Sequence, residues 1–535
     1  MKQRFLLVFV VLATIVFSSC SNENTTQESD VQSLGEVTEF ASVDRGVLFK
    51  TKTRTTGIYD GFKIKFYWTS GDKLWINNPT APSVFTQSVK DDIDKRIAVS
   101  KDGKSKYANF YFSGTLTANS YKLRYTGKGN PASDKVTIKA QQTQQTSNDA
   151  SHIGADGDCG TATATKNGGR YEFALDHKAA YLTFTPFYCL EELDNSVTIE
   201  SIMVSANENL AGTFNFNDDG IQTASVTSPS KRVTLSLGGG FNIPYSIDYA
   251  KCAAIMVVAP GTYTNFTVEY HLRDSETGVT GTVSKTYPSV KLNAGRNKPV
   301  AFNFTLDKYD MNYYMWDAGK PYWDGYKGKL PVKDGEQAAY GGVGTNRYYN
   351  GNKTQLYAVN ACKVCPNANE AALYVFRGNP HWDETTLWVK NKHLYKGGMW
   401  FLKLKYCDGG PYTSPVKAYP GGKDYCANSY WSTWDENNKT VGSDKWIKVP
   451  SQGKPADTSK YFYLPAMGYL DNDGGKQGLL KLKTAGYQGA YWTSTSVLFG
   501  GWSQQAICLH FSKDQVGLDA DLRWWAYPIF TVADK

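Results

Sequence analysis

The chain has 535 residues, which is enough for about three domains that each bury their own core. Aromatic residues make up 14% of the chain, with 36 Tyr and 14 Trp, and 49 Gly separate short strand-like runs, a composition typical of exported β-rich proteins rather than helical or disordered ones. Removing residues 1–19 takes Lys2 and Arg4 away and lowers the net charge from +8 to +6, and no long basic run remains, so the charge gives no case for nucleic-acid binding.

Residues 1–19 have the pattern of a bacterial lipoprotein signal. A basic start precedes an apolar run, Phe5 to Phe17, and two serines then lead to Cys20. This small-small-Cys ending is where such signals are cut and the new N-terminal cysteine is acylated. A transmembrane helix is the alternative, but a span needs roughly 20 apolar residues and this run is shorter. We therefore expect lipidation at Cys20 and a flexible polar tether over residues 20–40.

From about Arg45 to Phe304, short runs of alternating polarity are broken by turn residues. FKIKFYW, YANFYFSGTL, AYLTFTPF and VTIESIMVSA are examples, and helical periodicity is almost absent. Such runs predict two β-sandwiches. The polar, Gly-rich stretch SNDASHIGADGDCGTATATKNGG favours a boundary there, with one sandwich over residues 41–165 and the second over 166–305.

Residues 306–345 form an aromatic connector that includes YDMNYYMWDAGKPYWDGYKGKLP. Its rings are expected to pack against both neighbouring domains and to fix their angle, since burial is the common fate of such side chains. The alternative is an aromatic platform on which sugars stack.

The sequence pattern changes over residues 346–535, which predict an α+β domain with long surface loops. ANEAALYVF is predicted to be a helix that stops near Gly378, with Asn367 and Glu370 as a capping box. HWDETTLWVKNKHLYKGG follows, and then Gly-, Tyr- and Trp-rich loops alternate with short hydrophobic strands.

The CxxC pair Cys362 and Cys365, directly before this helix, has three interpretations. Half of a zinc site is one, but no second ligand pair lies at short spacing, and His381 and His393 are isolated. A redox dithiol is the second, because a helix N-terminus stabilises a thiolate, yet no βαβ pattern surrounds the pair. A structural disulfide is favoured, since eight cysteines remain after Cys20 in an oxidising compartment. The pairing stays open; the candidates in this region are Cys362, Cys365, Cys407, Cys426 and Cys508.

Several N-terminal segments resemble the fimbrillin-like lipoproteins, which are related to type V pili, of anaerobic Gram-negative gut and oral bacteria. They are the lipoprotein signal, YWTSGDKLWI, FALDHKAAYLTF and VKLNAGRNKPVAFNF. The resemblance implies two transthyretin-like β-sandwiches carried to the outer membrane by the lipid. It also implies protease cleavage after an arginine, here Arg45 or Arg54, after which a strand of another subunit fills the exposed groove. Either arginine is equally well an ordinary loop residue.

The C-terminal region resembles C-type-lectin-like domains. The segments that carry this resemblance are CPNANEAALYVF, NPHWDETTLW, GGMWF, YFYLPAMGY and the series GAYWTSTS, AICLHF and DLRWWAYPIF. Such domains keep a small core and vary their loops, which implies ligand binding. The calcium-dependent sugar motifs of animal lectins are missing, so calcium-mediated sugar binding is not expected. Asp471 and Asp473 could hold calcium, but a hairpin turn is favoured because no downstream glutamate completes the loop.

No catalytic motif is present in the sequence: GxSxG, HExxH and a Walker loop are all missing. We expect no enzyme activity, cofactor or metal. The sequence predicts a lipid-anchored surface adhesin, or a fimbrial tip or accessory subunit, that binds host or bacterial surface ligands through residues 346–535. The alternative is a standalone glycan-binding lipoprotein that forms no fibre.

Overall fold

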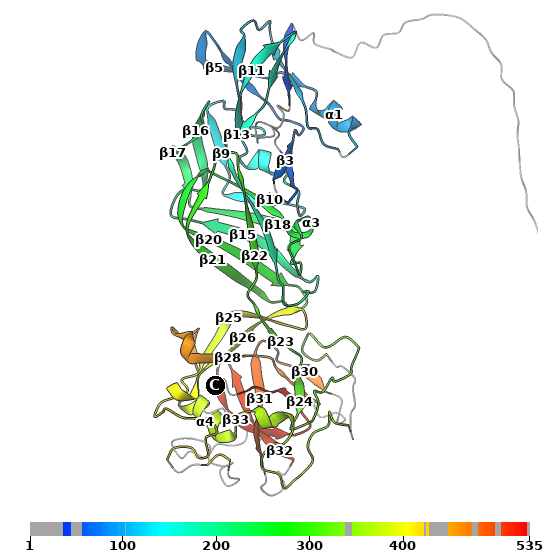
Figure 1. The fold of residues 1–535 in the computed structure, drawn as a ribbon, viewed down its shortest axis with the longest axis vertical. Helices are drawn as coiled ribbons and strands as arrows, with labels where there is room; N and C mark the ends of the chain where they lie inside the picture. Colours follow the sequence, from blue (N-terminus) through cyan, green and yellow to red (C-terminus); the bar gives the residue numbers. More distant parts are fainter. Residues whose placement is uncertain are drawn as a thin grey trace, which may run out of the picture.

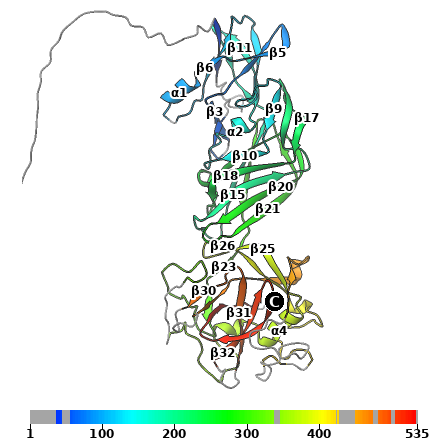
Figure 2. The same cartoon turned by 180° about the vertical axis from the view of Figure 1, so that it is seen from behind.

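The computed structural model describes residues 36–43, 56–61, 63–101, 103–336, 345–421, 424–426, 448–472, 480–497 and 504–531. Within these residues the chain is mainly β, as predicted. Figure 1 shows three β-rich units that follow one another along the long axis, and Figure 2 shows the same order from behind. None of the helices in the described part of the chain has the length and apolarity that a membrane span requires.

The N-terminal unit is built on one nine-stranded sheet. Its strand order is β5-β4-β8-β11-β12-β1-β7-β6, with β13 beside β11. The strands are β1 (Val37–Ser42), β4 (Trp75–Asn78), β5 (Ala81–Gln87), β6 (Lys90–Asp91), β7 (Asn109–Ser113), β8 (Ser120–Tyr125), β11 (Gly160–Asn167), β12 (Arg170–Phe173) and β13 (Asp176–His177). Helix α1 (Ile93–Val99) lies beside the sheet. Alternate residues such as Phe110 and Phe112 are buried, and they join Phe40, Trp68 and Phe173 in the core, as a period of two requires.

The middle unit has four small sheets around the largest hydrophobic core. Their orders are β10-β18-β15-β20-β21, β19-β14-β22, β17-β16-β9 and β2-β3. The strands are β2 (Thr56–Tyr59), β3 (Ile64–Tyr67), β9 (Lys135–Ile138), β10 (Gln141–Gln144), β14 (Ala180–Phe187), β15 (Val197–Ser205), β16 (Ala211–Asn217), β17 (Gly220–Ser230), β18 (Arg232–Asn242), β19 (Ala254–Val258), β20 (Gly261–Asp274), β21 (Thr280–Leu292) and β22 (Asn297–Asn303). The short helices are α2 (Ile153–Asp156) and α3 (Tyr249–Cys252).

The chain crosses between these two units several times. Ile64 and Phe66 of β3, and Val136 and Ile138 of β9, are buried in the middle core. Trp68 and the strands β4 to β8 belong to the N-terminal core or sheet, and β11 to β13 return to that sheet after β10. Segments of the two cores therefore alternate along the chain. The predicted domain boundary at residue 165 stays a prediction.

In the described residues, the C-terminal unit contains three sheets and one longer helix. The orders are β23-β25-β26-β28 with β27 beside β25, β24-β34-β29-β30, and β31-β32-β33. The strands are β23 (Asp307–Tyr309), β24 (Tyr313–Met315), β25 (His381–Lys390), β26 (His393–Leu402), β27 (Ser451–Gln452), β28 (Tyr461–Pro465), β29 (Tyr469–Asp471), β30 (Lys481–Lys483), β31 (Gln488–Ser496), β32 (Gln505–Ser512), β33 (Val516–Leu522) and β34 (Ala526–Pro528). The 3-10 helices are η1 (Ala361–Val364), η2 (Leu404–Tyr406) and η4 (Thr458–Lys460).

The predicted helix is confirmed as α4 (Ala368–Phe376). The Asn367 side chain accepts a hydrogen bond from the Glu370 amide at 3.0 Å, and the Glu370 carboxylate accepts one from the Asn367 amide at 2.8 Å. This reciprocal pair is the capping box expected from the sequence, and it satisfies two amides that a helix start leaves without intrahelical partners.

The aromatic connector is part of the C-terminal unit. β23 pairs with β25 and β24 pairs with β34, so residues 307–315 complete two of its sheets. Tyr313, Trp316 and Tyr322 are buried among side chains of the same unit. These three rings thus serve as core residues, whereas Tyr309, Tyr314 and Tyr326 of the connector are partly exposed.

Candidate functional site

The middle and C-terminal units meet through two hairpins. The turn between β20 and β21, residues 275–279, lies against the β25–β26 hairpin. Leu387, Val389 and Leu394 of that hairpin belong to the middle unit's hydrophobic core. A Cβ on Gly281 would come within 2.7 Å of Leu387, so the glycine permits this close approach.

Asp274 holds this junction together with one carboxylate. It accepts hydrogen bonds from the Leu394 amide at 3.0 Å and the Ser196 hydroxyl at 2.9 Å, and its Oδ2 lies 3.0 Å from His393 Nδ1. Burial alone would raise the pKa of Asp274, but the hydrogen bonds from His393, Leu394 and Ser196 outweigh it and lower the pKa to about 2. His393, which the sequence left as an isolated packing residue, therefore contacts the neighbouring unit.

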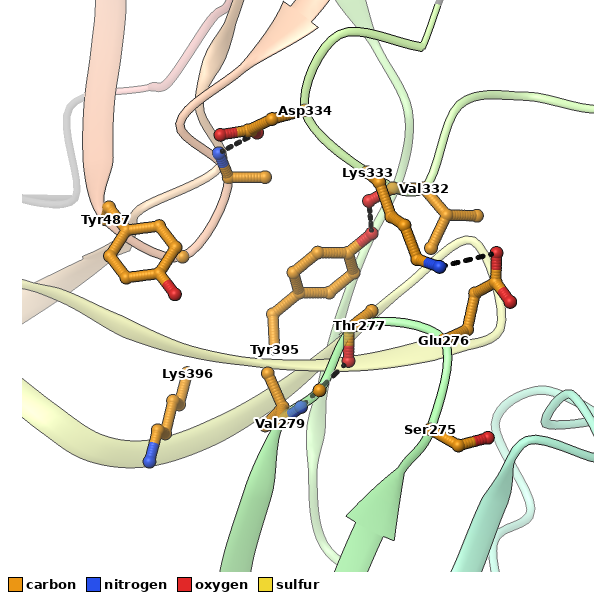
Figure 3. Close-up of a pocket in the computed structure, with 13 residues that line it drawn as sticks. Ser275, Glu276, Thr277, Val279, Val332, Lys333, Asp334, Tyr395, Lys396 and Tyr487 are labelled. Atoms are coloured by element: carbon orange, nitrogen blue, oxygen red, sulfur yellow. Dashed lines mark hydrogen bonds and ion pairs between the residues drawn. The ribbon is translucent and has the colours of Figure 1, made fainter.

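A pocket of about 420 Å³ opens at this junction. Four segments line it, and Figure 3 shows their side chains. The segments are the β20–β21 turn, the loop over residues 332–334, residues 395–396 of β26, and the β30–β31 loop over residues 485–487. This volume lies within the range of pockets that bind small ligands.

Hydrogen bonds and one ion pair hold the pocket wall in place. Lys333 Nζ lies 3.4 Å from Glu276 Oε1, and the Tyr395 hydroxyl donates to the Val332 carbonyl at 2.8 Å (Figure 3). The Asp334 carboxylate accepts from the Ala485 amide at 3.2 Å. These contacts connect the loop over residues 332–334 to each of the other three segments, so all four segments are held relative to one another.

The pocket combines an exposed ring with charges of both signs. Tyr487 is 74% exposed, whereas Tyr395 is buried, and Glu276, Lys333, Asp334 and Lys396 supply acceptors and donors around the opening. None of the thirteen lining residues is a histidine or a cysteine. A flat ring beside polar groups suits a ligand that has an apolar face and several hydroxyl groups.

A second, apolar groove of about 150 Å³ runs along the middle unit between two sheet edges. β21 ends the five-stranded sheet and β22 ends a three-stranded sheet, and in the part of the chain that the structure describes no further strand pairs with either edge. The groove is lined by Leu182, Phe266, Val268, Tyr287, Val290, Lys298, Pro299, Val300 and Ala301. Unpaired edges above apolar side chains are able to accept an added strand.

The comparisons with known proteins give weak structural similarity only. No family model matches the chain, and no curated protein matches it. The chain is similar to a "putative cell adhesion protein" of Bacteroides ovatus, at 14% identity and a TM-score of 0.31, over 50% of this chain and 93% of that one. It is also similar to a "putative adhesin" of Bacteroides ovatus at 11% identity and a TM-score of 0.24, over 51% and 89% of the two chains. A fimbrial protein of Bacteroides ovatus matches 92% of this chain and 98% of its own, at 13% identity and a TM-score of 0.24.

The disulfide prediction has no support in the structure. None of the eight cysteines after Cys20 forms a disulfide within the described residues. Cys362 lies within η1 and Cys365 directly follows it. Both are buried, and the Cys362 sulfur accepts a hydrogen bond from the Asp317 amide at 3.1 Å. Burial raises the pKa of the Cys362 thiol, and the neighbouring Cys365 raises it further, which is the opposite of an activated redox thiol.

The other three candidate cysteines are all buried in the C-terminal unit. Cys407 is buried after η2, and Cys426 lies 3.8 Å from the Thr495 hydroxyl. Cys508 is in β32 and shares a small hydrophobic cluster with Cys362 and Cys365. Each of the three stays only a candidate for a disulfide.

Several predicted site residues lie outside the described residues. These are Cys20, Arg45, Arg54 and Asp473. Asp471 ends β29. Because Asp473 lies outside the described residues, calcium binding by these two aspartates stays a question that the structure does not address.

Sequence reasoning missed the junction pocket because its lining comes from four separated segments without a motif. It also missed a group formed by Cys508, His510 and Asp521. A signal for that group was present, since Cys508 and His510 are two apart in a predicted strand and so share one face.

Proposed function

We propose that the protein is a lipid-anchored adhesin of the outer membrane surface that binds host or bacterial ligands through its C-terminal unit. The arrangement along the long axis carries this proposal: β1 lies in the unit at one end, and the C-terminal unit lies at the other (Figures 1 and 2). With a lipid on Cys20, which precedes β1, the C-terminal unit would be the part furthest from the membrane.

The fimbrial form of the proposal places this protein at a tip or accessory position. The first two units would be transthyretin-like modules and the third a C-type-lectin-like module, as the sequence resemblance implies. A bulky C-terminal unit suits an end position better than a position inside a shaft, where a strand must be donated from the end of the chain.

The first experiment is shear release of surface filaments, followed by gold labelling with an antibody to residues 346–535. Label concentrated at filament ends supports a tip adhesin. Label spread over the cell body, with none in the sheared fraction, overturns the fimbrial form and leaves a standalone surface protein.

Strand exchange with other fimbrial subunits is supported by the apolar groove between β21 and β22. Cleavage at Arg45 or Arg54 would accompany it. Changing both arginines to Ala is expected to abolish assembly into sheared filaments, with Arg170→Ala, at the exposed first residue of β12, as a control. Unchanged assembly in the double variant rejects cleavage at these sites.

The second candidate is a standalone glycan-capture lipoprotein, which the exposed Tyr487 ring at the junction pocket favours. The purified protein would be applied to a glycan array, and the strongest hit would then be titrated by calorimetry. Tyr487→Ala is expected to weaken that binding about ten-fold, because it removes a stacking face. Tyr406→Ala, which removes an exposed ring elsewhere on the same unit, should leave the affinity unchanged. Equal loss in both variants, or no array signal, rejects glycan binding at this pocket.

A further inference from the structure

Three potential metal ligands meet on one face of the β31–β32–β33 sheet. Cys508 and His510 come from β32, and Asp521 comes from β33. His510 Nε2 lies 2.6 Å from Asp521 Oδ2, Cys508 Sγ lies 3.1 Å from the same oxygen, and His510 Nε2 lies 3.1 Å from Cys508 Sγ. A thiol, an imidazole and a carboxylate thus point at one another.

Strand pairing explains why these side chains converge. Ala506 lies opposite Asp521 and Cys508 lies opposite Asp519, so alternate residues of both strands share one face. His510 lies opposite Gly517, which has no side chain to compete for the space. The three donors therefore sit on two paired antiparallel strands, of which β32 has a paired strand on both sides.

Two aromatic rings pack beside the three donors, and Asp519 lies opposite Cys508 in the strand pair. Trp492 and Tyr527 stack at 4.3 Å, and they share a hydrophobic cluster with Cys508. The Tyr527 hydroxyl donates to Asp521 Oδ2 at 2.6 Å and so orients the carboxylate. The His510 and Asp521 side chains remain 10% and 14% exposed, which gives an ion a route from solvent. In proteins, apolar side chains commonly surround a metal site, and a further residue commonly hydrogen-bonds to one of the side chains that bind the metal.

We propose that Cys508, His510 and Asp521 bind one zinc-type divalent ion. Sulfur, nitrogen and carboxylate oxygen are the donors that Zn²⁺ takes in proteins, and three protein ligands leave its fourth tetrahedral position to water or another small ligand. Tetrahedral donors lie about 3.5 Å apart, so the three side chains spread slightly around the ion, and the Cys508 thiol releases its proton to solvent as the sulfur–metal bond forms. The ion ties β32 to β33 at this edge of the C-terminal unit.

The test uses the full chain, freed of bound metal with a chelator and titrated with Co²⁺ as the spectroscopic probe. Binding of one Co²⁺ per chain, with a thiolate-to-metal charge-transfer band and tetrahedral d–d bands, is the expected result. Zn²⁺ should displace the cobalt and raise the melting temperature progressively as the free Zn²⁺ concentration exceeds its Kd.

Cys508→Ser should abolish the charge-transfer band, and His510→Gln should weaken Co²⁺ binding by at least about 100-fold. Cys426→Ser, which removes another buried thiol of the same unit, should leave both unchanged. The absence of the charge-transfer band in the unmodified chain overturns the proposal whether or not a variant folds. A band that persists in Cys508→Ser overturns it equally, and the three residues would then be a buried hydrogen-bonded group without a metal.

Discussion

One carboxylate, that of Asp274, connects three parts of the molecule: its own turn, Ser196 and the hairpin of the next unit. Because Asp274 is fully buried, its hydrogen bonds have no water to replace them. An isosteric amide keeps the volume of the side chain but supplies only one acceptor oxygen. Asp274→Asn is therefore expected to cost on the order of 2 kcal/mol of unfolding free energy at pH 7.

The pH dependence of this effect has a defined sign. The Asp274 pKa is lowered to about 2 in the folded protein, below the ordinary value of 3.8. Its stabilising contribution is thus complete above about pH 5 and is lost as the pH falls through about 4 towards 2. Thermal unfolding at pH 7 and pH 3 should show the difference between the unmodified protein and Asp274→Asn shrinking at pH 3. An equal difference at both pH values would contradict this account.

Lys390 changes stability with pH in the same direction as Asp274, but in a higher pH window and because its charged form is destabilised by burial. Its ammonium group is fully buried, with Tyr313 Oη at 3.0 Å and the Met467 carbonyl at 3.2 Å, and it lies 4.6 Å from the centre of the Tyr395 ring. Burial lowers the pKa of Lys390 to about 7. The unfolded chain therefore binds more protons between about pH 7 and 10, and Lys390 makes stability rise with pH in that window.

Lys390→Met should stabilise the protein by about 1 to 3 kcal/mol at pH 7, because a buried charge is replaced by an apolar chain of similar length. The Tyr313 hydroxyl keeps the Met467 carbonyl as its acceptor at 2.6 Å. Chemical denaturation at pH 7 and pH 9.5 should show the advantage of the variant declining at the higher pH. A variant that is less stable at pH 7 would mean that the ring contacts outweigh the cost of burial.

At the level of elements, the capping box of α4 can be tested directly. Asn367→Ala removes the acceptor for the Glu370 amide and a donor to the Val416 carbonyl at 3.0 Å. The expected loss is about 1 to 2 kcal/mol of unfolding free energy. Asn367→Ala combined with Glu370→Ala should lose less than the sum of the single variants, since the two side chains act as a pair. Additive losses would show that the two caps work independently.

Helix α4 and the strands that follow runs of alternating polarity could be predicted from the sequence, but their partners could not. Strand β1 begins at Val37, inside the stretch that the sequence predicted as a flexible tether. Period-2 runs such as AYLTFTPF are visible locally, whereas β14 pairs with β22 more than a hundred residues later. The same limit applies to the sites. Cys508 and His510 are neighbours in the sequence, yet only the register of β33 brings Asp521 to them. The pocket depends on four separate segments, and no local sequence pattern indicates that they meet.

At the level of the whole molecule, the junction between the middle and C-terminal units should behave as a packed interface. Leu387→Ala is expected to cost about 2 to 4 kcal/mol and to separate the unfolding of the two units, because Leu387 belongs to the core of the middle unit. Leu482→Ala is the matched control, since Leu482 is buried wholly within the C-terminal unit. Calorimetry should show a second transition for Leu387→Ala only, and a single transition in both variants would contradict this assignment.

The interleaving of the first two units has a mechanical consequence. A tensile load applied between the N-terminus and a ligand on the C-terminal unit is shared by several chain segments where β2, β3, β9 and β10 cross into the middle core. Within the described residues the backbone passes between the middle and C-terminal units once, near Leu306, so there the load is carried by one chain segment and by the hairpin contacts. Under increasing force the second junction should extend first, and the interleaved pair should stay intact as one stiff arm.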